Sequence, residues 1–520
     1  MESGIASIIA AIRSHTTDAD VKWDACLATC NLAMTCNNQV KIAAAGGIKL
    51  VITAMCSYKA HVEIQQYACA ALCNLACHDD FDNAVKIVAE GSIEVIITAM
   101  RSHKAHVEIQ QRACEGLCFL AHQDDNQVKI AAAGGMELII TAMHSHVAHV
   151  AIQQDACKCL FNLASCDDYQ AKILPAGGLE LIIAAMCSHK THVEIQQHTC
   201  QALFNLACCD DNQVKIASAG GIKLLITAMR SHNAHAEIQQ DACDALRILL
   251  RHDDNQVKIA AEGGIELIIA AMCSHKTHVE IQQNACQALS NLAINHDNQS
   301  KIATAGGIKL IITAMRRHKT HVEIQQDACD ALRNLSCHDD NQIKIAAAGG
   351  IELLIAAMRS HTSHDEIQQD SFEALCNVAC HDDNQVHIAS AGGFELIITS
   401  MRSQLADILM QQNTCEALCN LACHDDNQVK IAAAGDIELI IITARRSHVA
   451  HVEVQQHACT ALRKLADNDG NNRVKIETAG GMELITGAVL RHAAKFSPPL
   501  NEHEVEEVTA FTKKRVVPGC

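Results

Sequence analysis

Amide side chains recur at a fixed position along this sequence of 520 residues. An asparagine column, with one member in most copies of an internal repeat, comprises Asn31, Asn74, Asn162, Asn205, Asn291, Asn334, Asn377 and Asn420. Phe119, Ile248 and Lys464 interrupt the column. Because a primary amide both donates and accepts hydrogen bonds, amides spaced one repeat apart could hold the backbone of an extended peptide.

Carboxylates stand four and seven residues before the asparagine in the later copies, at Asp327, Asp330, Asp370, Glu373 and Glu416. Positions separated by three, four and seven residues share one face of a helix. These groups and the unbroken run from Asn291 to Asn420 therefore form the predicted main binding site, in which carboxylates would bind lysine or arginine. The alternative is that the asparagines only cap or solvate the helix that carries them.

Histidine pairs with HxxH spacing could suggest a metal site, and eight copies carry them: His103 and His106, His146 and His149, His189 and His192, His232 and His235, His275 and His278, His318 and His321, His361 and His364, and His448 and His451. Zinc needs about four ligands at roughly 2.0–2.1 Å, whereas packed helices lie about 8–10 Å apart. Two neighbouring pairs are thus too far apart to share an ion. We expect loop residues copied with the repeat and no metal site.

Cysteine-containing strings near Cys73, Cys376 and Cys419 resemble a haem-attachment motif with one residue too many. Their spacing of four is one helical turn, and a packed helix end leaves no pocket for haem. The sequence contains no nucleophile elbow, phosphate-binding glycine loop or HExxH motif. We therefore expect no cofactor and no enzymatic activity.

An internal repeat positions all these residues. A GG or related pair marks each copy, with glycines at Gly46, Gly91, Gly134, Gly177, Gly220, Gly263, Gly306, Gly349, Gly392, Gly435 and Gly480 and a degenerate first copy at Ser3. The interval is 43 residues, or 45 where extra residues precede the NxVKI segment. A helical period of about 40–47 residues indicates units that must stack to bury their apolar faces.

Each repeat is predicted to contain three helices. A short helix such as 255–262 begins after aspartates that act as N-caps and stops at the glycine pair. A second helix follows the glycines, and a third begins after the histidine-containing loop. In the third helix over 62–76, Ile64, Ala68, Leu72 and Leu75 share the face that should form the core.

The composition supports stacked helices and restricts the partners. Hydrophobic residues make up 49% of the chain but aromatic residues only 2%, so the core must consist of small and aliphatic side chains. The net charge of −18 argues against nucleic acid and anionic membranes as partners and favours basic proteins. No segment reads as a signal peptide or a membrane span, and 28 cysteines then indicate buried thiols in a reducing compartment. Cytoplasm is the expected location, with the nucleus as alternative.

The short helix, the glycines after it and a third helix ending in ALxNLA resemble armadillo repeats, as in importin-α, beta-catenin and the vacuolar armadillo proteins. The resemblance implies an all-α, right-handed superhelical solenoid with about eleven repeats and a partial C-terminal repeat. It also implies that the asparagine column, including Asn31, Asn74, Asn162 and Asn205, faces a concave groove and binds an extended peptide. Importin-α-like grooves also carry tryptophan four residues before the asparagine, but the only tryptophan here, Trp23, lies outside that column.

The sequence thus predicts a solenoid over residues 1–492, with repeat units starting near residues 3, 46, 91, 134, 177, 220, 263, 306, 349, 392, 435 and 480. Residues 493–520 would form a capping segment or a flexible tail. The predicted function is a non-enzymatic scaffold that binds extended, basic protein segments. An import adaptor and a purely structural solenoid arm are the alternatives.

Overall fold

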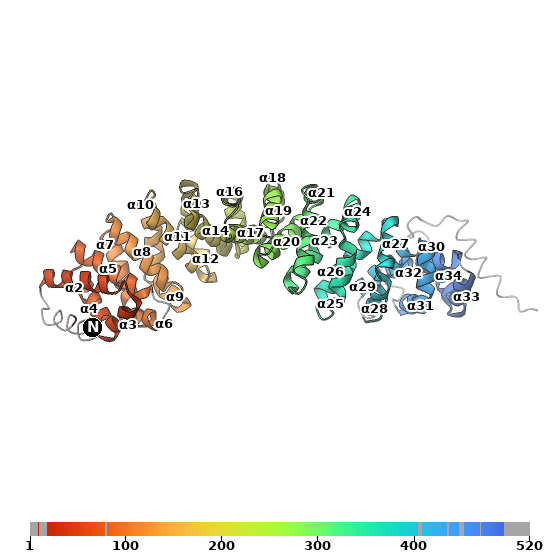
Figure 1. Cartoon of the computed structure of the whole chain (residues 1–520), viewed down its shortest axis with the longest axis horizontal. Coiled ribbons are helices and arrows are strands. Elements are labelled where there is room, and N and C mark those ends of the chain that lie inside the picture. The colour runs from red at the N-terminus through yellow and green to blue at the C-terminus, as the bar shows by residue number, and fades with distance from the viewer. Residues whose placement is uncertain are drawn as a thin grey trace, which may run out of the picture. The chain divides into compact units, whose positions relative to one another are not determined.

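A computed structural model describes residues 9, 18–77, 81–403, 408–433, 436–446, 452–468 and 470–492. The degenerate first copy near Ser3, Gly435 and the segment 493–520 lie outside these residues. The chain divides into two compact units, Met1–Leu267 and Ile268–Cys520. Every regular element in the described ranges is a helix, as predicted (Figure 1).

Unit 1 consists of three-helix repeats. Its short first helices are α3 (Cys36–Ala44), α6 (Phe81–Ala89), α9 (Asp124–Ala132), α12 (Asp167–Ile173), α15 (Asp210–Ser218) and α18 (Asp253–Ala261). Its second helices are α4 (Gly47–Ser57), α7 (Ser92–Ser102), α10 (Gly135–Ser145), α13 (Gly178–Ser188) and α16 (Gly221–Ser231). Its third helices are α2 (Ala19–Leu32), α5 (Val62–Ala76), α8 (Val107–Leu120), α11 (Val150–Leu163), α14 (Val193–Ala207) and α17 (Ala236–Leu249). The boundary between the units falls within α19 (Gly264–Ser274).

Unit 2 continues the same order. Its first helices are α21 (His296–Thr304), α24 (Asp339–Ala347), α27 (Asp382–Ser390), α30 (Asp425–Ala433) and α33 (Gly470–Thr478). Its second helices are α22 (Gly307–Arg317), α25 (Gly350–Ser360), α28 (Gly393–Ser403), α31 (Asp436–Arg446) and α34 (Gly481–His492). Its third helices are α20 (Val279–Ala293), α23 (Val322–Ser336), α26 (Asp365–Val378), α29 (Ile408–Leu421) and α32 (Val452–Asn468).

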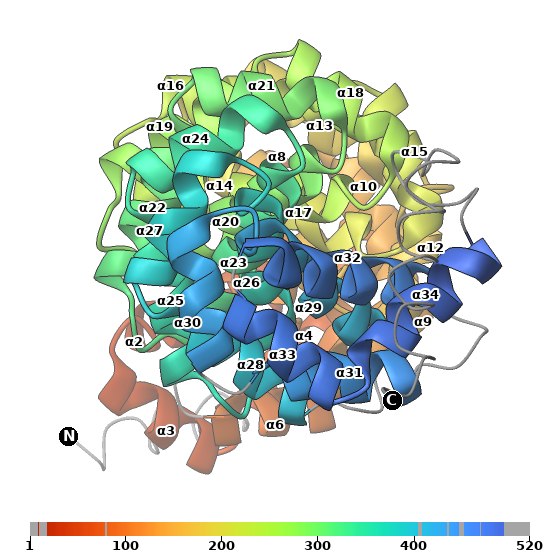
Figure 2. The same ribbon diagram turned by 90° about the vertical axis from the view of Figure 1, so that its right-hand side faces the viewer.

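The third helices pack against one another from repeat to repeat and form the core of each unit. Within unit 2, α20, α23, α26 and α29 lie toward the inside, and the second helices α22, α25 and α28 lie toward the outside (Figure 2). We call the exposed part of these third helices, together with that of α32, which packs against α29, the third-helix surface.

Small side chains allow this close packing. The predicted cysteine position beside the core alanines is buried in every copy that carries it: Cys69, Cys114, Cys157, Cys200, Cys243, Cys286, Cys329, Cys415 and Cys459. Burial raises the pKa of Cys69 and of Cys157 to about 12, so these thiols stay protonated at neutral pH. They act as small apolar residues.

Both glycines of the GG pair are needed, for different reasons. Gly349 has φ +81°, the left-handed conformation predicted for the residue that ends the first helix. Gly350 begins the second helix, and a Cβ atom there would lie 2.6 Å from Ile345 Cγ2 and 2.8 Å from the Ile345 carbonyl oxygen. The sequence indicated the first role but not the second, a close approach of two helices.

Within the described ranges, no single helix is long and apolar enough to cross a membrane. Two pairs of consecutive helices, α3 with α4 and α12 with α13, are long and apolar enough when taken together, but the pairs are bent by 74° and 75°.

Replacing Gly350 with alanine should destabilise unit 2 by about 1–3 kcal/mol, because the new methyl group must displace the backbone of α24. Thermal unfolding, together with hydrogen exchange in α24 and α25, measures this loss. Gly116→Ala is the control: that glycine lies inside α8 and its nearest neighbour would be 3.7 Å from the added Cβ. The control should leave stability unchanged or raise it by about 0.5–1 kcal/mol; equal losses at both positions would contradict the packing argument.

Candidate functional site

The asparagine column connects neighbouring third helices. In unit 1, the amide nitrogens of Asn74, Asn162 and Asn205 donate to carbonyl oxygens of the preceding third helix, over 3.0–3.2 Å. The acceptors, Cys30, Cys118 and Phe161, lie in the last turn of their helices. Carbonyls in that turn have no partner within the helix, so each asparagine caps the end of its neighbour.

The same contact continues in unit 2 with different acceptors. Asn334 donates to the carbonyl oxygen of Ser290 at 3.3 Å and to its hydroxyl at 2.9 Å. Asn377 donates to Ser336 Oγ at 3.0 Å, and Asn420 donates to Cys380 Sγ at 3.4 Å. A capping role is therefore present, although the capped helix is the neighbouring one.

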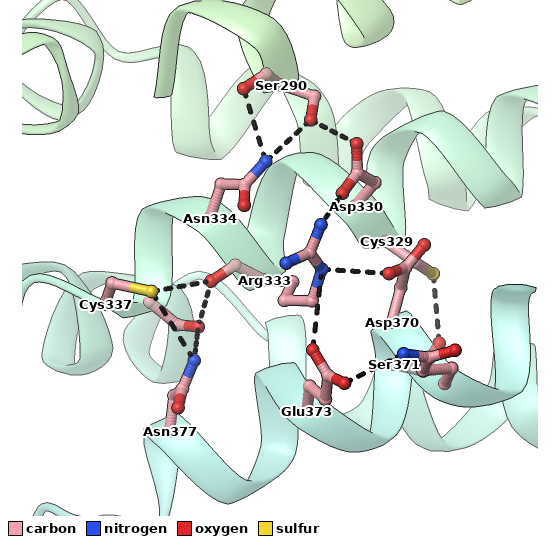
Figure 3. Close-up of polar contacts among 12 residues, drawn as sticks. Ser290, Cys329, Asp330, Arg333, Asn334, Cys337, Asp370, Ser371, Glu373 and Asn377 are labelled. Carbon is pink, nitrogen blue, oxygen red and sulfur yellow. Dashed lines mark hydrogen bonds and ion pairs between the residues drawn. The ribbon is translucent and has the colours of Figure 1, made fainter. Parts of the chain in front are cut away.

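Capping uses the amide nitrogen, so the amide oxygen is the group that each asparagine can offer to a ligand. In Figure 3 the amide nitrogens of Asn334 and Asn377 make the contacts, and their side-chain oxygens contact none of the residues drawn. Asn162, Asn205 and Asn334 are 7–9% exposed, whereas Asn74, Asn291, Asn377 and Asn420 are half-buried and Asn31 is exposed. Where a side chain of this column is exposed, its amide oxygen can accept a hydrogen bond.

Lys464 interrupts the asparagine column in sequence but keeps its contact. Its Nζ lies 3.2 Å from the Cys419 carbonyl oxygen and 2.9 Å from Cys423 Sγ, on the preceding helix α29 and the turn that follows it. Phe119 has no polar group for such a bond; the ammonium of Lys158 lies 5.8 Å from the centre of its ring instead.

The structure brings three of the predicted carboxylates together around a cation of the chain itself (Figure 3). Arg333 pairs with Asp330 on its own helix, and its Nε lies 2.9 Å from Asp370 Oδ1 and 3.8 Å from Glu373 Oε2 on α26. Convergence from two adjacent helices was predicted, but with a ligand cation at the centre. In the structure Arg333 occupies that centre, and binding of a ligand cation by these carboxylates stays a prediction.

The other two predicted carboxylates lie on either side of this cluster. Asp327 is half-buried on α23 and Glu416 is half-buried on α29. Burial is the largest cause of the raised pKa values of the Cys376 and Cys380 thiols, and the charge of Glu416 is the next largest. Five carboxylates and one guanidinium therefore lie along α23, α26 and α29, which gives this surface a net negative charge.

Burial and mutual repulsion raise the pKa of some carboxyl groups on the third helices to values near neutral pH. Burial, assisted by the charges of Asp330 and Glu373, raises the pKa of Asp370 to about 6 even though Arg333 opposes the shift. In unit 1, burial raises the pKa of Asp155 and of Asp241 to about 7. The charge of the surface consequently depends on pH near neutrality.

The histidine pairs have structural contacts that the sequence did not reveal. The first histidine of a pair approaches a backbone carbonyl of the preceding repeat, as in His103 Nε2 to Lys59 O and His232 Nε2 to Lys190 O, both 2.8 Å. The second histidine is the N-cap residue of the third helix, and in two pairs its side chain makes the capping bond: His106 Nδ1 accepts from the Ile109 amide at 3.5 Å, and His149 Nδ1 accepts from the Ile152 amide at 3.4 Å. Among the described residues, no group of three or more His, Cys, Asp or Glu is arranged to hold a metal ion.

Replacing Arg333 with methionine should destabilise unit 2 by about 1–2 kcal/mol at pH 8, since three half-buried carboxylates lose their counter-ion. The folded-state pKa of Asp370 lies above its unfolded value, so lowering the pH through about 6 protonates it and reduces the repulsion. The deficit should therefore shrink between pH 8 and pH 5 in urea titrations.

The matched control for this experiment is Arg247→Met, which removes a guanidinium paired with Asp244 on its own helix. Its effect on stability should be smaller. A deficit in Arg333→Met that does not change with pH would show that its carboxylates do not act as a cluster.

Comparison with known proteins agrees with this geometry. Among curated proteins, none matches the chain. An engineered protein of known structure is similar with 27% identity and a TM-score of 0.67, over 80% of this chain and 98% of its own. A structure from a study of the interaction between cadherin and beta-catenin is similar in fold, with 17% identity and a TM-score of 0.73, over 89% of this chain and 94% of its own. Residues 44–404 match the family model described as LRRK2 ARM repeat. Since this match spans more than half of the sequence, the chain belongs to the armadillo-repeat proteins, in the LRRK2 ARM repeat family.

Proposed function

We propose that the chain is a non-enzymatic scaffold that binds extended, basic protein segments along the third-helix surface of unit 2. The observation that supports this most directly is the excess of carboxylates over Arg333 on α23, α26 and α29. Backbone N–H groups, ammonium groups and guanidinium groups are donors, so an extended segment with lysine or arginine complements this surface.

Arg333, a cation of the surface itself, limits where a cation of the ligand can bind. Arg333 already pairs with Asp330, Asp370 and Glu373, so a basic side chain must share these carboxylates or bind beside them. Glu416 lies one repeat further along, and Asn413 donates to Glu373 Oε1 at 3.3 Å between the two. We therefore place the main contact of a ligand lysine or arginine between Glu373 and Glu416.

A structural solenoid arm is the second candidate, and one observation favours it. The amide nitrogens of Asn74, Asn162, Asn205 and Asn334 are all used between repeats, which is sufficient to explain why the column is present. This role requires no ligand. An import adaptor, the other alternative for an acidic groove, would additionally bind an importin-β-like carrier.

Neutralising Glu373 and Glu416 together with glutamine should weaken binding of a lysine- and arginine-rich extended peptide by roughly 3- to 30-fold, from about 0.3–1 kcal/mol for each charge. Fluorescence anisotropy of the labelled peptide with the full chain measures this, and raising the salt concentration should reduce the difference.

The control removes the same charge elsewhere in the same two repeats. Glu352 and Glu395 are exposed on the second helices α25 and α28, and the double change to glutamine should leave the affinity within about twofold. Equal losses in both double variants would mean that only net charge matters. If the wild-type chain binds no basic peptide, the structural arm is the better assignment.

A further inference from the structure

Two basic residues stand on α32, at positions where the preceding repeats of unit 2 carry Arg333 with its carboxylates and the asparagine column. Arg463 on α32 occupies the repeat position of Arg333, but Thr460 stands where Arg333 has Asp330. Lys464 occupies the adjacent asparagine position. Among the carboxylates whose side chains the structure describes, which do not include Asp467, none forms an ion pair with either side chain.

The partners that Lys464 does have are weak ones for a cation. Its ammonium is half-buried and lies 2.9 Å from Cys423 Sγ, 3.5 Å from Cys419 Sγ and 3.2 Å from the Cys419 carbonyl oxygen. Thiol sulfurs are poor acceptors, and a partly desolvated charge is costly without an opposite charge nearby. An anionic group placed there would satisfy Lys464 better than water or thiols do.

The charge of the third-helix surface thus changes from negative to positive between α29 and α32. On α29, Glu416 is acidic; on α32, which packs against α29, Arg463 and Lys464 are basic. In the preceding repeats Asp330, Asp370 and Glu373 outnumber Arg333. A uniformly basic ligand would complement α23 to α29 but would be repelled at α32.

We infer that Arg463 and Lys464 form an acid-binding subsite, which receives acidic side chains from the same extended segment whose basic residues lie over α26 and α29. This inference rests on the proposed function and specifies the ligand further. Third helices about 8–10 Å apart correspond to roughly three residues of extended chain. The ligand should therefore carry its acidic residues about three positions from its basic ones.

The chain offers a variant that removes the charge and keeps the structural contact. Asn377 and Asn420 occupy the position of Lys464 in the two preceding repeats, and each places its amide nitrogen near a thiol, Cys337 and Cys380 respectively, over 3.8 and 3.4 Å. Lys464→Asn restores this arrangement opposite Cys423. A loss of binding preference in this variant would therefore report the charge and not a disrupted fold.

The test uses the full chain and two labelled peptides that share one basic cluster. One peptide carries glutamates three residues from the cluster, and the other carries glutamines there; both orders of the two groups along the peptide are measured. The glutamate peptide, in one order, should bind about three- to tenfold more tightly than its glutamine counterpart. Lys464→Asn should reduce this ratio to about one, whereas Lys475→Asn, which removes an exposed charge from α33, should preserve it.

Other outcomes would contradict either the subsite or the proposed function. If the wild-type chain binds both peptides equally, or if Lys464→Asn keeps the ratio, the subsite is excluded while the proposed function stands. If neither peptide binds, the proposed function itself fails. The chain also carries an acidic run at Glu502, Glu504, Glu506 and Glu507. These four are therefore also changed to glutamine in the full chain, and equal binding of the two peptides excludes the subsite only when this variant shows it as well.

Discussion

Helix ends are the constraint on which the structure depends. A solenoid of short helices has many final turns, and each leaves carbonyl groups without a partner inside the helix. Side-chain amides supply the missing donors. Gln110 Nε2 bonds the carbonyls of Met100 and His103 at the end of the second helix, and Asn126 and Gln127 bond those of Leu120 and Ala121 at the end of the third. The same contacts recur in repeat after repeat, so stacking the helices and satisfying their ends are one process.

This requirement shapes the surface that a ligand would meet. Because the asparagine nitrogens are used for capping, the exposed ends of these side chains are acceptors, and a donor-rich ligand is the natural complement. Specificity must then come from positions that stacking does not fix. Arg333 and Lys464 are examples. Arg333 on α23 contacts Asp370 in the following repeat, whereas Lys464 on α32 contacts Cys423 in the preceding repeat. The carboxylates around Arg333 favour a basic ligand group, and Lys464 favours an acidic one.

The sequence was sufficient for the fold because the information lies within one repeat. The glycine that ends the first helix, the apolar spacing around Leu72 and the buried position of Cys69 all depend on neighbours a few residues away. The candidate site was harder. The ion pair between Arg333 and Asp330 has a recognisable spacing of three, and attention to the residue before each asparagine would have found it. Its pairs with Asp370 and Glu373, and the bond from His103 to Lys59, join residues 37–44 positions apart and become visible only once the repeats are stacked.

The residues that interrupt the asparagine column differ in whether they can donate a hydrogen bond to the preceding third helix. An amide is one solution to an uncapped helix end, and an ammonium is another, since both place a nitrogen donor against the preceding helix. Phe119 and Ile248 lack a donor for the third helices before them, α5 and α14. At the end of α14, the first helix that follows, α15, supplies amides: Asn212 bonds the carbonyl of Leu206 and Gln213 that of Ala207. Capping is redundant at several third helices: the end of α8, for example, receives donors from Asn126 on α9 and from Asn162 on α11. Redundancy of this kind allows a column residue to change without loss of the stack, and it explains how the surface can vary in charge and polarity from repeat to repeat while its backbone stays regular.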